Sequence, residues 1–238
     1  NTDLQRYKSL LPEMGLPFIK SIAIAPILLD GKIIGSFNQA AFDRQRFKPG
    51  IDTSLLERLA VKVSICLSNV TAHEKLTFLA YQDPLTGLLN RRAMENALNR
   101  EFSRDNRYAG KLSVVFLDLD DFKQVNDRYG HDYGDALLTH VAQNLLKMSR
   151  EPDIVARYAG DEFVVILPET KADDALCLMT RLQAHFTDHP MIIGATTIPV
   201  SISFGVASTE DPEIDSPELI LKRADERLYA AKQTRGSS

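Results

Sequence analysis

One short stretch constrains the fold of this chain more than any other: residues 157–163, which read Arg-Tyr-Ala-Gly-Asp-Glu-Phe. Apolar, largely β-branched runs lie on both sides of it, at 154–156 and 164–167. Two such runs around a break of small residues predict a β-hairpin. The tight turn of this hairpin would then hold two carboxylates, Asp161 and Glu162, outside the sheet.

A second pair of acids, Asp118 and Asp120, ends another strand-like run at 113–117. Carboxylates at the ends of adjacent strands repel one another unless a cation lies between them. The two acidic clusters together therefore suggest a site for hard metal ions. Each cluster alone is better explained without a metal, as a solvated hairpin tip or as an unrelated acidic strand end.

The segment Ala159–Phe163 resembles the signature of the GGDEF family, the diguanylate cyclases, with alanine in the first position. Further motifs follow the family order, at 83–92 (DPLTGLLNRR), 118–127 (DLDDFKQVND), 130–135 (GHDYGD), 203–207 (SFGVA) and 223–232 (RADERLYAAK). The resemblance covers residues 82–235. It implies an α/β (α+β), palm-like nucleotidyl cyclase fold with an antiparallel hairpin at its centre, and the condensation of two GTP into cyclic di-GMP and two pyrophosphates.

The resemblance also implies metal ligands. Asp118, Asp161 and the backbone carbonyl of Leu119 match the family's ligands for Mg²⁺ or Mn²⁺, with two ions in each GTP site. Glu162 matches a carboxylate that either binds the second metal or deprotonates the attacking hydroxyl, and the sequence leaves both roles open. Asp120 is expected to support the site from behind.

Phosphate contacts are implied next. Phe122 and Lys123 lie in a segment that the family uses against the triphosphate, and Lys232 matches a further phosphate-binding lysine. The arginine usual four residues later is replaced by Gly236, with Arg235 one place early, which puts one phosphate contact in doubt.

Asn126 and Asp135 match the family's guanine-recognition pair. A carboxylate can accept from the N1–H and the 2-amino group of guanine, and an amide can both donate and accept. The alternative is that these two residues only shape a turn and cap a helix.

Arg150 and Asp153 match the family's RxxD inhibitory site, where cyclic di-GMP binds away from the chemistry. Ala159 is the main departure from the family pattern. If the turn requires a positive φ there, alanine costs about 1 kcal/mol, so we expect it to be tolerated.

Residues 1–51 resemble the C-terminal part of a GAF sensor domain, with an Asp-Gly hairpin turn at 30–31. A structural dimerisation module is the alternative. Residues 52–81 predict a long signalling helix, and its apolar heptad seam predicts a parallel coiled coil in a homodimer. The seam residues are Leu56, Leu59, Val63, Cys66, Val70, His73, Thr77 and Ala80. Residues 82–238 form the predicted GGDEF catalytic domain.

Within that domain, the apolar patterns predict helices and strands in alternation. The helices are expected at 91–102, 134–148, 173–186 and 217–232, and the strands outside the hairpin at 112–117, 192–193 and 198–206.

Composition narrows the function further. The chain of 238 residues has a net charge of −4 and no basic stripe, so we expect no nucleic acid partner. It contains no apolar run of about 20 residues and no signal peptide, which predicts a cytoplasmic protein without a membrane segment. Cys66 and Cys177 are expected to be buried thiols. The chain begins with Asn1, so we expect a fragment of a longer protein.

The favoured interpretation is a diguanylate cyclase controlled by dimer geometry and product feedback. The alternative is a catalytically weak GGDEF domain that binds cyclic di-GMP or GTP as a regulatory module.

Overall fold

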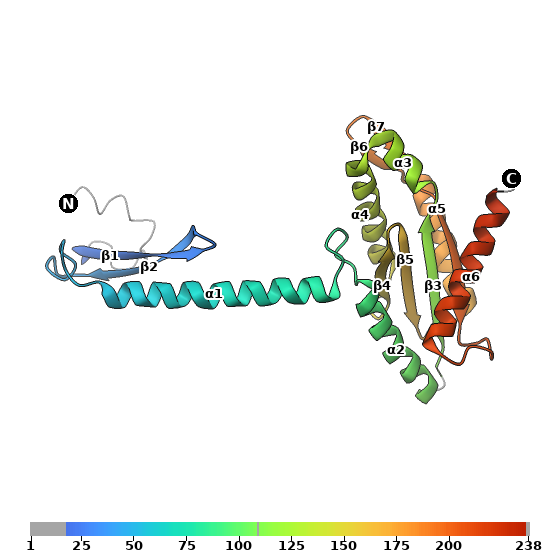
Figure 1. Ribbon diagram of the computed structural model, residues 1–238, viewed down its shortest axis with the longest axis horizontal. Coiled ribbons are helices and arrows are strands. Elements are labelled where there is room, and N and C mark those ends of the chain that lie inside the picture. Colours follow the sequence, from blue (N-terminus) through green and yellow to red (C-terminus); the bar gives the residue numbers. More distant parts are fainter. Residues whose placement is uncertain (1–17, 109, 237–238) are drawn as a thin grey trace. The chain divides into compact units, whose positions relative to one another are not determined.

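The computed structural model describes residues 18–108 and 110–236 and divides the chain into two compact units, 1–77 and 78–238 (Figure 1). Residues 1–17 of the predicted first domain lie outside the described residues. The unit boundary falls within a helix, close to the predicted start of the catalytic domain.

The first unit contains one antiparallel strand pair, β1 (Ser21–Leu29) and β2 (Lys32–Ala41). The connecting turn is Asp30-Gly31, with φ of 50° and 76°. Both residues tolerate positive φ, which is why this dipeptide closes a two-residue hairpin. The predicted hairpin is confirmed, whereas the GAF resemblance remains a prediction.

Helix α1 (Ser54–Tyr81) follows, as the seam pattern predicted. Its first two turns bury Leu56 and Ala60 against Ala23 and Ala25 of β1. Leu56, the first residue of the predicted seam, is therefore buried by contacts within this chain. Later apolar side chains of the helix, such as Val70, stay exposed.

The second unit is built on a four-stranded antiparallel sheet with the order β4-β5-β3-β8. The strands are β3 (Leu112–Leu119), β4 (Ile154–Ala159), β5 (Glu162–Pro168) and β8 (Ile202–Ser208). β4 and β5 are the predicted central hairpin. β3 lies beside β5, in a register that pairs Asp118 with Glu162. A small pair, β6 (Met191–Ile193) and β7 (Thr196–Ile198), stands apart from this sheet.

Helices cover both faces of the sheet (Figure 1). α4 (His131–Met148) and α5 (Ala172–Asp188) pack on one face, against alternate residues such as Val115 and Val165. α2 (Arg91–Tyr108) and α6 (Pro217–Gly236) cover the other, against Val114 and Phe116. The alternation of side chains along a strand thus produces two cores from one sheet.

Gly205 of β8 allows α6 to lie close to the sheet. A Cβ at this position would overlap the Ala224 carbonyl oxygen and the Leu228 amide nitrogen of that helix. These are backbone atoms, which cannot turn aside as a side chain would. The glycine of the SFGVA motif therefore has a packing role.

The structure corrects some of the expectations. Phe122–Tyr129 form a helix, α3, which is absent from the expected helices, and the predicted strand at 198–206 is divided between β7 and β8. Cys66 and Cys177 are both exposed in the single chain, so the prediction of buried thiols is wrong for Cys177, whereas Cys66 belongs to the predicted dimer seam. In α5, the face that contains Ala175, Met179 and Leu182 enters the core, and Cys177 lies off that face.

Among the described residues, no helix is long and apolar enough to span a bilayer.

Candidate active site

The turn between β4 and β5 presents the two predicted acids. Ala159 pairs with Glu162, so Gly160 and Asp161 form the loop between them. The positive φ of the turn, 50°, falls on Gly160 and not on Ala159. Alanine at the first signature position therefore carries no left-handed backbone strain, and the main departure from the family pattern is sterically tolerated.

Three acidic residues meet near this turn. The antiparallel register places Asp118 directly opposite Glu162, and the Leu119 N–H donates to the Asp161 carbonyl oxygen at 3.3 Å. The Asp118 side chain is buried and forms an ion pair with the Lys232 ammonium from α6, with Nζ 2.6 Å from Oδ1. Lys232, which was predicted to contact phosphate, is therefore ion-paired with Asp118, which was predicted to bind metal.

The electrostatics of the turn favour a cation. Burial raises the pKa of Asp118; the hydrogen bond from Lys232 lowers it, and the charge of Asp161 raises it again. Burial also raises the pKa of Glu162, with further contributions from Asp118, Asp161 and Asp225. These acids repel one another in the folded protein, because the fold holds their charges close together in a partly desolvated place.

The residues present fit divalent cations by their chemistry. Carboxylate and carbonyl oxygens are the ligands that Mg²⁺ prefers, and mutual repulsion is what such an ion relieves. In the described chain, no three His, Cys, Asp or Glu side chains are grouped closely enough to hold a metal by themselves. Mg²⁺ is commonly held by one or two carboxylates together with substrate phosphates and water.

Asp120 supports the site from behind. The hydroxyls of Ser201 and Ser203 donate to its two carboxylate oxygens at 2.7 and 2.6 Å. The Asp120 N–H donates to the Ser201 carbonyl at 3.0 Å. These bonds fix the end of β3 beyond Asp118, which is the supporting role expected from the sequence.

Helices α3 and α4 carry the remaining predicted substrate residues. Phe122 and Lys123 lie in the first turn of α3, after Asp121, whose φ of 58° turns the chain sharply out of β3. Phe122 packs against the core and Lys123 is exposed. The side chain of Arg235 lies outside the described residues.

Asn126 lies inside α3 and Asp135 inside α4, so neither is a turn or cap residue. The buried Oδ1 of Asn126 has no hydrogen-bond partner in the described chain. It lies against Gly134, where a Cβ would overlap it. A buried, unpaired amide oxygen costs about 1–3 kcal/mol, which a ligand donor can recover.

Comparisons with known proteins decide the family. The model of the family described as "Diguanylate cyclase, GGDEF domain" matches residues 80–238, well over half of the chain. This chain belongs to the GGDEF family. The match covers both acidic clusters and helices α3, α4 and α6, and the described fold agrees with it.

Relatives of the GGDEF domain include the response regulator PleD of Caulobacter vibrioides, 42% identical over 156 residues, and the diguanylate cyclase DgcP of Pseudomonas aeruginosa, 39% identical over 154 residues. Each match covers 65% of this chain but only 34% of PleD and 23% of DgcP. The coiled coil and GGDEF domain of DgcB from Caulobacter crescentus, solved with c-di-GMP, superimposes with a TM-score of 0.66 at 28% identity. That match covers 76% of this chain and 96% of DgcB's.

An ion pair that sequence reasoning missed holds the turn of this GGDEF domain. Arg157 donates through Nε to the Gly160 carbonyl oxygen at 2.9 Å and through Nη1 to both oxygens of Asp83, at 3.1 and 3.2 Å. Asp83 also accepts from the amide and hydroxyl of Thr86. Both ionic residues stand within motifs recognised in the sequence, but only the fold brings them together across 74 positions.

The predicted inhibitory residues lie at the far end of β5 in the GGDEF domain. The Arg150 N–H donates to Asp153 Oδ2 at 2.6 Å, so the pair closes the turn before β4. Both line a cavity of about 200 Å³ with Arg181 and Cys177 of α5, and with Leu167. From Glu162 to Leu167 the strand rises about 16 Å, at about 3.3 Å per residue. Arg181 was not predicted, because it lies far along the chain from the RxxD motif.

We expect Asp83→Asn to destabilise the GGDEF domain by about 1–3 kcal/mol at pH 7, because it removes the charge that Arg157 contacts. Burial alone would raise the pKa of Asp83, but hydrogen bonds from Thr86 and Arg157 outweigh it and lower the pKa below 3.8. The stabilisation is therefore complete above about pH 4 and is lost as pH falls through the folded pKa. Urea unfolding of wild type and variant at several pH values measures this difference.

Asp173→Asn is the matched control, since Asp173 is an exposed acid of α5 that should show no such difference at pH 7. A gap between wild type and Asp83→Asn that stays constant down to pH 3 would contradict the assignment.

Proposed function

We propose that this chain is a diguanylate cyclase that condenses two GTP into cyclic di-GMP, with release of two pyrophosphates. The observation that carries the proposal is the cross-strand pair Asp118–Glu162 beside Asp161, with Lys232 on Asp118. The relative DgcP is a diguanylate cyclase and the similar DgcB domain was solved with c-di-GMP, and both support the proposal.

The reaction needs two transfers: in each, the 3′-oxygen of one nucleotide loses its proton and bonds to the α-phosphorus of the other, and the bond from that phosphorus to pyrophosphate breaks. Asp118, Asp161, Glu162 and the Leu119 carbonyl would hold two Mg²⁺ or Mn²⁺ ions in each site. When bound, such ions neutralise phosphate charge and lower the pKa of the attacking hydroxyl. No covalent help from the protein is needed.

The protein's own groups then have separate tasks. Lys232 would contact phosphate, and the first turn of α3, with Phe122 and Lys123, faces the triphosphate with helical N–H groups that have no partner within the helix. Glu162 would hold metal or accept the hydroxyl proton. Its raised pKa suits a base that must take up a proton.

Asp118→Asn should abolish cyclic di-GMP formation while the fold stays intact. Loss of even an outer-shell partner of a metal site costs about 10- to 100-fold, so we expect a loss of about 100-fold or more. Chromatographic detection of cyclic di-GMP after incubation with GTP and Mg²⁺ tests this, with Asp173→Asn as the charge-matched control. Substantial synthesis by Asp118→Asn would sink the metal-site assignment.

Guanine recognition is assigned to Asn126 and Asp135. Asp135 is exposed on α4, and Asn126 has an unpaired buried oxygen one helix away. Adenine does not present the N1–H and 2-amino donors that a carboxylate would accept from.

We also propose that the protein is cytoplasmic and that it has no nucleic acid partner.

Asp135→Ala should weaken GTP binding by about 1–3 kcal/mol, the usual cost of one lost polar partner. Gly134→Ala should weaken it as well, because a Cβ there displaces the Asn126 amide. Calorimetry with GTP measures both, and Lys147→Ala on the same helix is the control. Wild-type affinity in both variants would return Asn126 and Asp135 to purely structural roles.

A homodimer is required by the proposed chemistry, since each domain would hold one of the two GTP molecules. Helix α1 supports it: Leu59 and Val70 are 39% and 54% exposed, and such side chains on one helix suit a coiled coil. The DgcB structure that matches this chain also includes a coiled coil. A GAF-like sensor in 1–51 would act through the predicted helix 52–81 on the catalytic domain, 82–238.

The double variant Leu59→Glu with Val63→Glu should dissociate the dimer and remove activity together, because one domain holds half of a reaction. Light scattering and product formation, compared over a range of protein concentrations, follow both properties. Lys62→Glu introduces the same glutamate side chain outside the seam and is the control. It should leave both the dimer and the activity unchanged. A fully active monomeric variant would disprove the two-domain mechanism.

Product feedback is assigned to the cavity with Arg150, Asp153 and Arg181. Two guanidinium groups can bind phosphate or the Hoogsteen edge of guanine with paired hydrogen bonds, and Asp153 can accept from the base. The cavity is too far from Glu162 for product to exclude GTP by overlap. Inhibition would therefore be non-competitive, as a coupling between two sites.

Arg150→Ala and Arg181→Ala should each abolish tight cyclic di-GMP binding and raise final product levels, with initial turnover nearly unchanged. Calorimetric titration with cyclic di-GMP separates this from a role of Arg150 in ending α4, and Lys147→Ala is the control. Equal binding by the wild type and both variants would remove feedback from the proposal.

The alternative function is a GGDEF domain that binds cyclic di-GMP or GTP with little catalysis. The displaced arginine at 235 favours it. Nucleotide binding at wild-type strength without product from the intact dimer would establish this alternative.

A further inference from the structure

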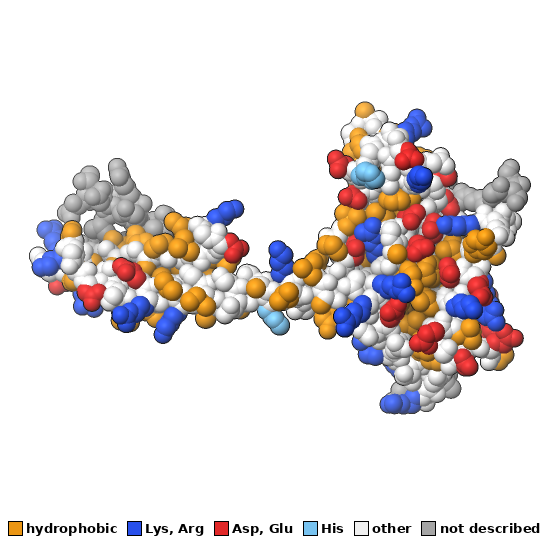
Figure 2. Space-filling view, in the orientation of Figure 1, with side chains coloured by type: hydrophobic (Ala, Val, Ile, Leu, Met, Phe, Trp, Pro, Cys, Tyr) orange, Lys and Arg blue, Asp and Glu red, His pale blue; other side chains and the backbone are white. Residues whose placement is uncertain are grey.

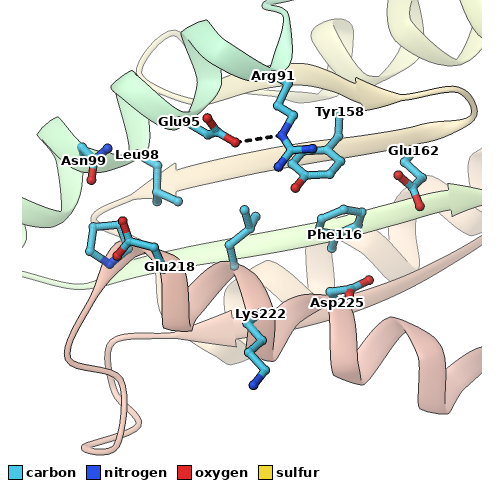
Figure 3. Close-up of a pocket in the computed structure, with 12 residues that line it drawn as sticks. Arg91, Glu95, Leu98, Asn99, Phe116, Tyr158, Glu162, Glu218, Lys222 and Asp225 are labelled. Carbon is cyan, nitrogen blue, oxygen red and sulfur yellow. Dashed lines mark hydrogen bonds and ion pairs between the residues drawn. The ribbon is translucent and has the colours of Figure 1, made fainter.

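A second cavity, of about 550 Å³, lies between α2 and α6 on the face of the sheet opposite α4 and α5 (Figure 3). Phe116 and Leu98 are buried at its floor, and Tyr158 and Leu221 are partly buried beside them. Among the residues assigned above to metal or nucleotide, only Glu162 lines it. The cavity is therefore distinct from the guanine and product sites.

The aromatic wall of the cavity is formed before any ligand binds. The Tyr158 ring meets Phe116 edge-on with centroids 4.9 Å apart. The Arg91 guanidinium lies over the Tyr158 ring, 4.4 Å from its centroid, and donates through Nε to Glu95 at 2.8 Å. Figure 3 shows this arrangement along one wall. Such stacked side chains have little freedom left to lose on binding.

The charges around the cavity are unbalanced. Its two basic residues are already paired, Arg91 with Glu95 and Lys222 with Glu226 at 3.8 Å. Within the described residues, Glu162, Glu218 and Asp225 have no ion-pair partner. A ligand with phosphate groups would meet net negative charge here, whereas a cation would be attracted.

We propose that this cavity binds small organic cations with a flat apolar body, such as aryl amidinium compounds. The flat body would lie on the apolar floor of Phe116 and Leu221 beside Tyr158, and the cationic group would face Asp225, while Glu218 adds negative charge at the other end of the cavity (Figure 3). Figure 2 shows the same pattern on this face: hydrophobic side chains gather between α2 and α6, with charged side chains along both borders. The volume lies within the usual range for small-molecule pockets, about 300–1,000 Å³.

The cavity lies beside the proposed catalytic turn, so a bound ligand would lie near that turn. Glu162 belongs both to its lining and to the proposed catalytic turn, so an occupant lies next to the carboxylate that the cyclase reaction would use. Binding is therefore measured on the full chain without nucleotide or metal, so that the outcome does not depend on cyclase activity.

Benzamidine is the probe, and neutral benzamide of the same shape is its control. We expect saturable benzamidine binding by calorimetry and at least tenfold weaker binding of benzamide. Asp225→Asn should weaken benzamidine binding about two- to fivefold, as expected for a single partly exposed ion pair. Glu218→Gln, which removes a charge at the other end of the cavity, should weaken it less. Leu221→Trp should fill the cavity and remove binding.

Asp173→Asn removes one surface charge from α5 and should bind benzamidine as the wild type does. No saturable binding by the wild type, equal affinity for benzamide, or unchanged affinity in both carboxylate variants would each overturn the proposal. If Leu221→Trp does not fold, the two carboxylate variants still decide the result.

Discussion

The ion pair between Arg157 and Asp83 connects the parts of the domain on which the active turn depends. The Arg157 guanidinium contacts the carbonyl of Gly160 inside the turn. It also contacts the carboxylate of Asp83, which lies in the segment after α1. Both side chains are largely shielded, with 16% and 18% of their surface exposed. A pair of this kind gains more from its hydrogen bonds than a surface pair would. The segment that follows α1 and the catalytic turn are therefore joined by the Arg157 side chain.

The central sheet supplies the rigidity that this contact requires. β3 and β5 are buried on both faces, so their side chains alternate between two cores. The register that pairs Asp118 with Glu162 is favoured by this packing, because a shift by one residue would move the side chains of each strand into the opposite core, where their sizes and shapes would not match. Gly205 adds a second restraint by letting the backbone of α6, which carries Lys232, approach β8.

Charge at the turn works against stability and in favour of chemistry. Burial and neighbouring acids raise the pKa of both Asp118 and Glu162, so ionising them at neutral pH costs the folded protein free energy. Lys232 offsets part of this cost at Asp118. Ligands that bring cations would offset the rest, which is why such sites are stable when loaded and strained when empty.

The sequence by itself determined the central hairpin, the family and the identity of the acids in the turn. These depend on local patterns: β-branched runs around Gly160, and short motifs whose order is written in the chain. It also determined the Asp30-Gly31 turn, because positive φ at both positions is a local property. Only the tertiary structure decided which distant side chains meet.

The contact between Asp83 and Arg157, the place of Arg181 beside Arg150, and the cavity under Arg91 each join elements that no short-range pattern connects. The sequence likewise could not decide that Cys177 faces outward or that the positive φ falls on Gly160 and not on Ala159. Burial and turn geometry follow from how helices and strands pack together. A side chain's partners are set by that packing, which the periodicity of one segment does not contain.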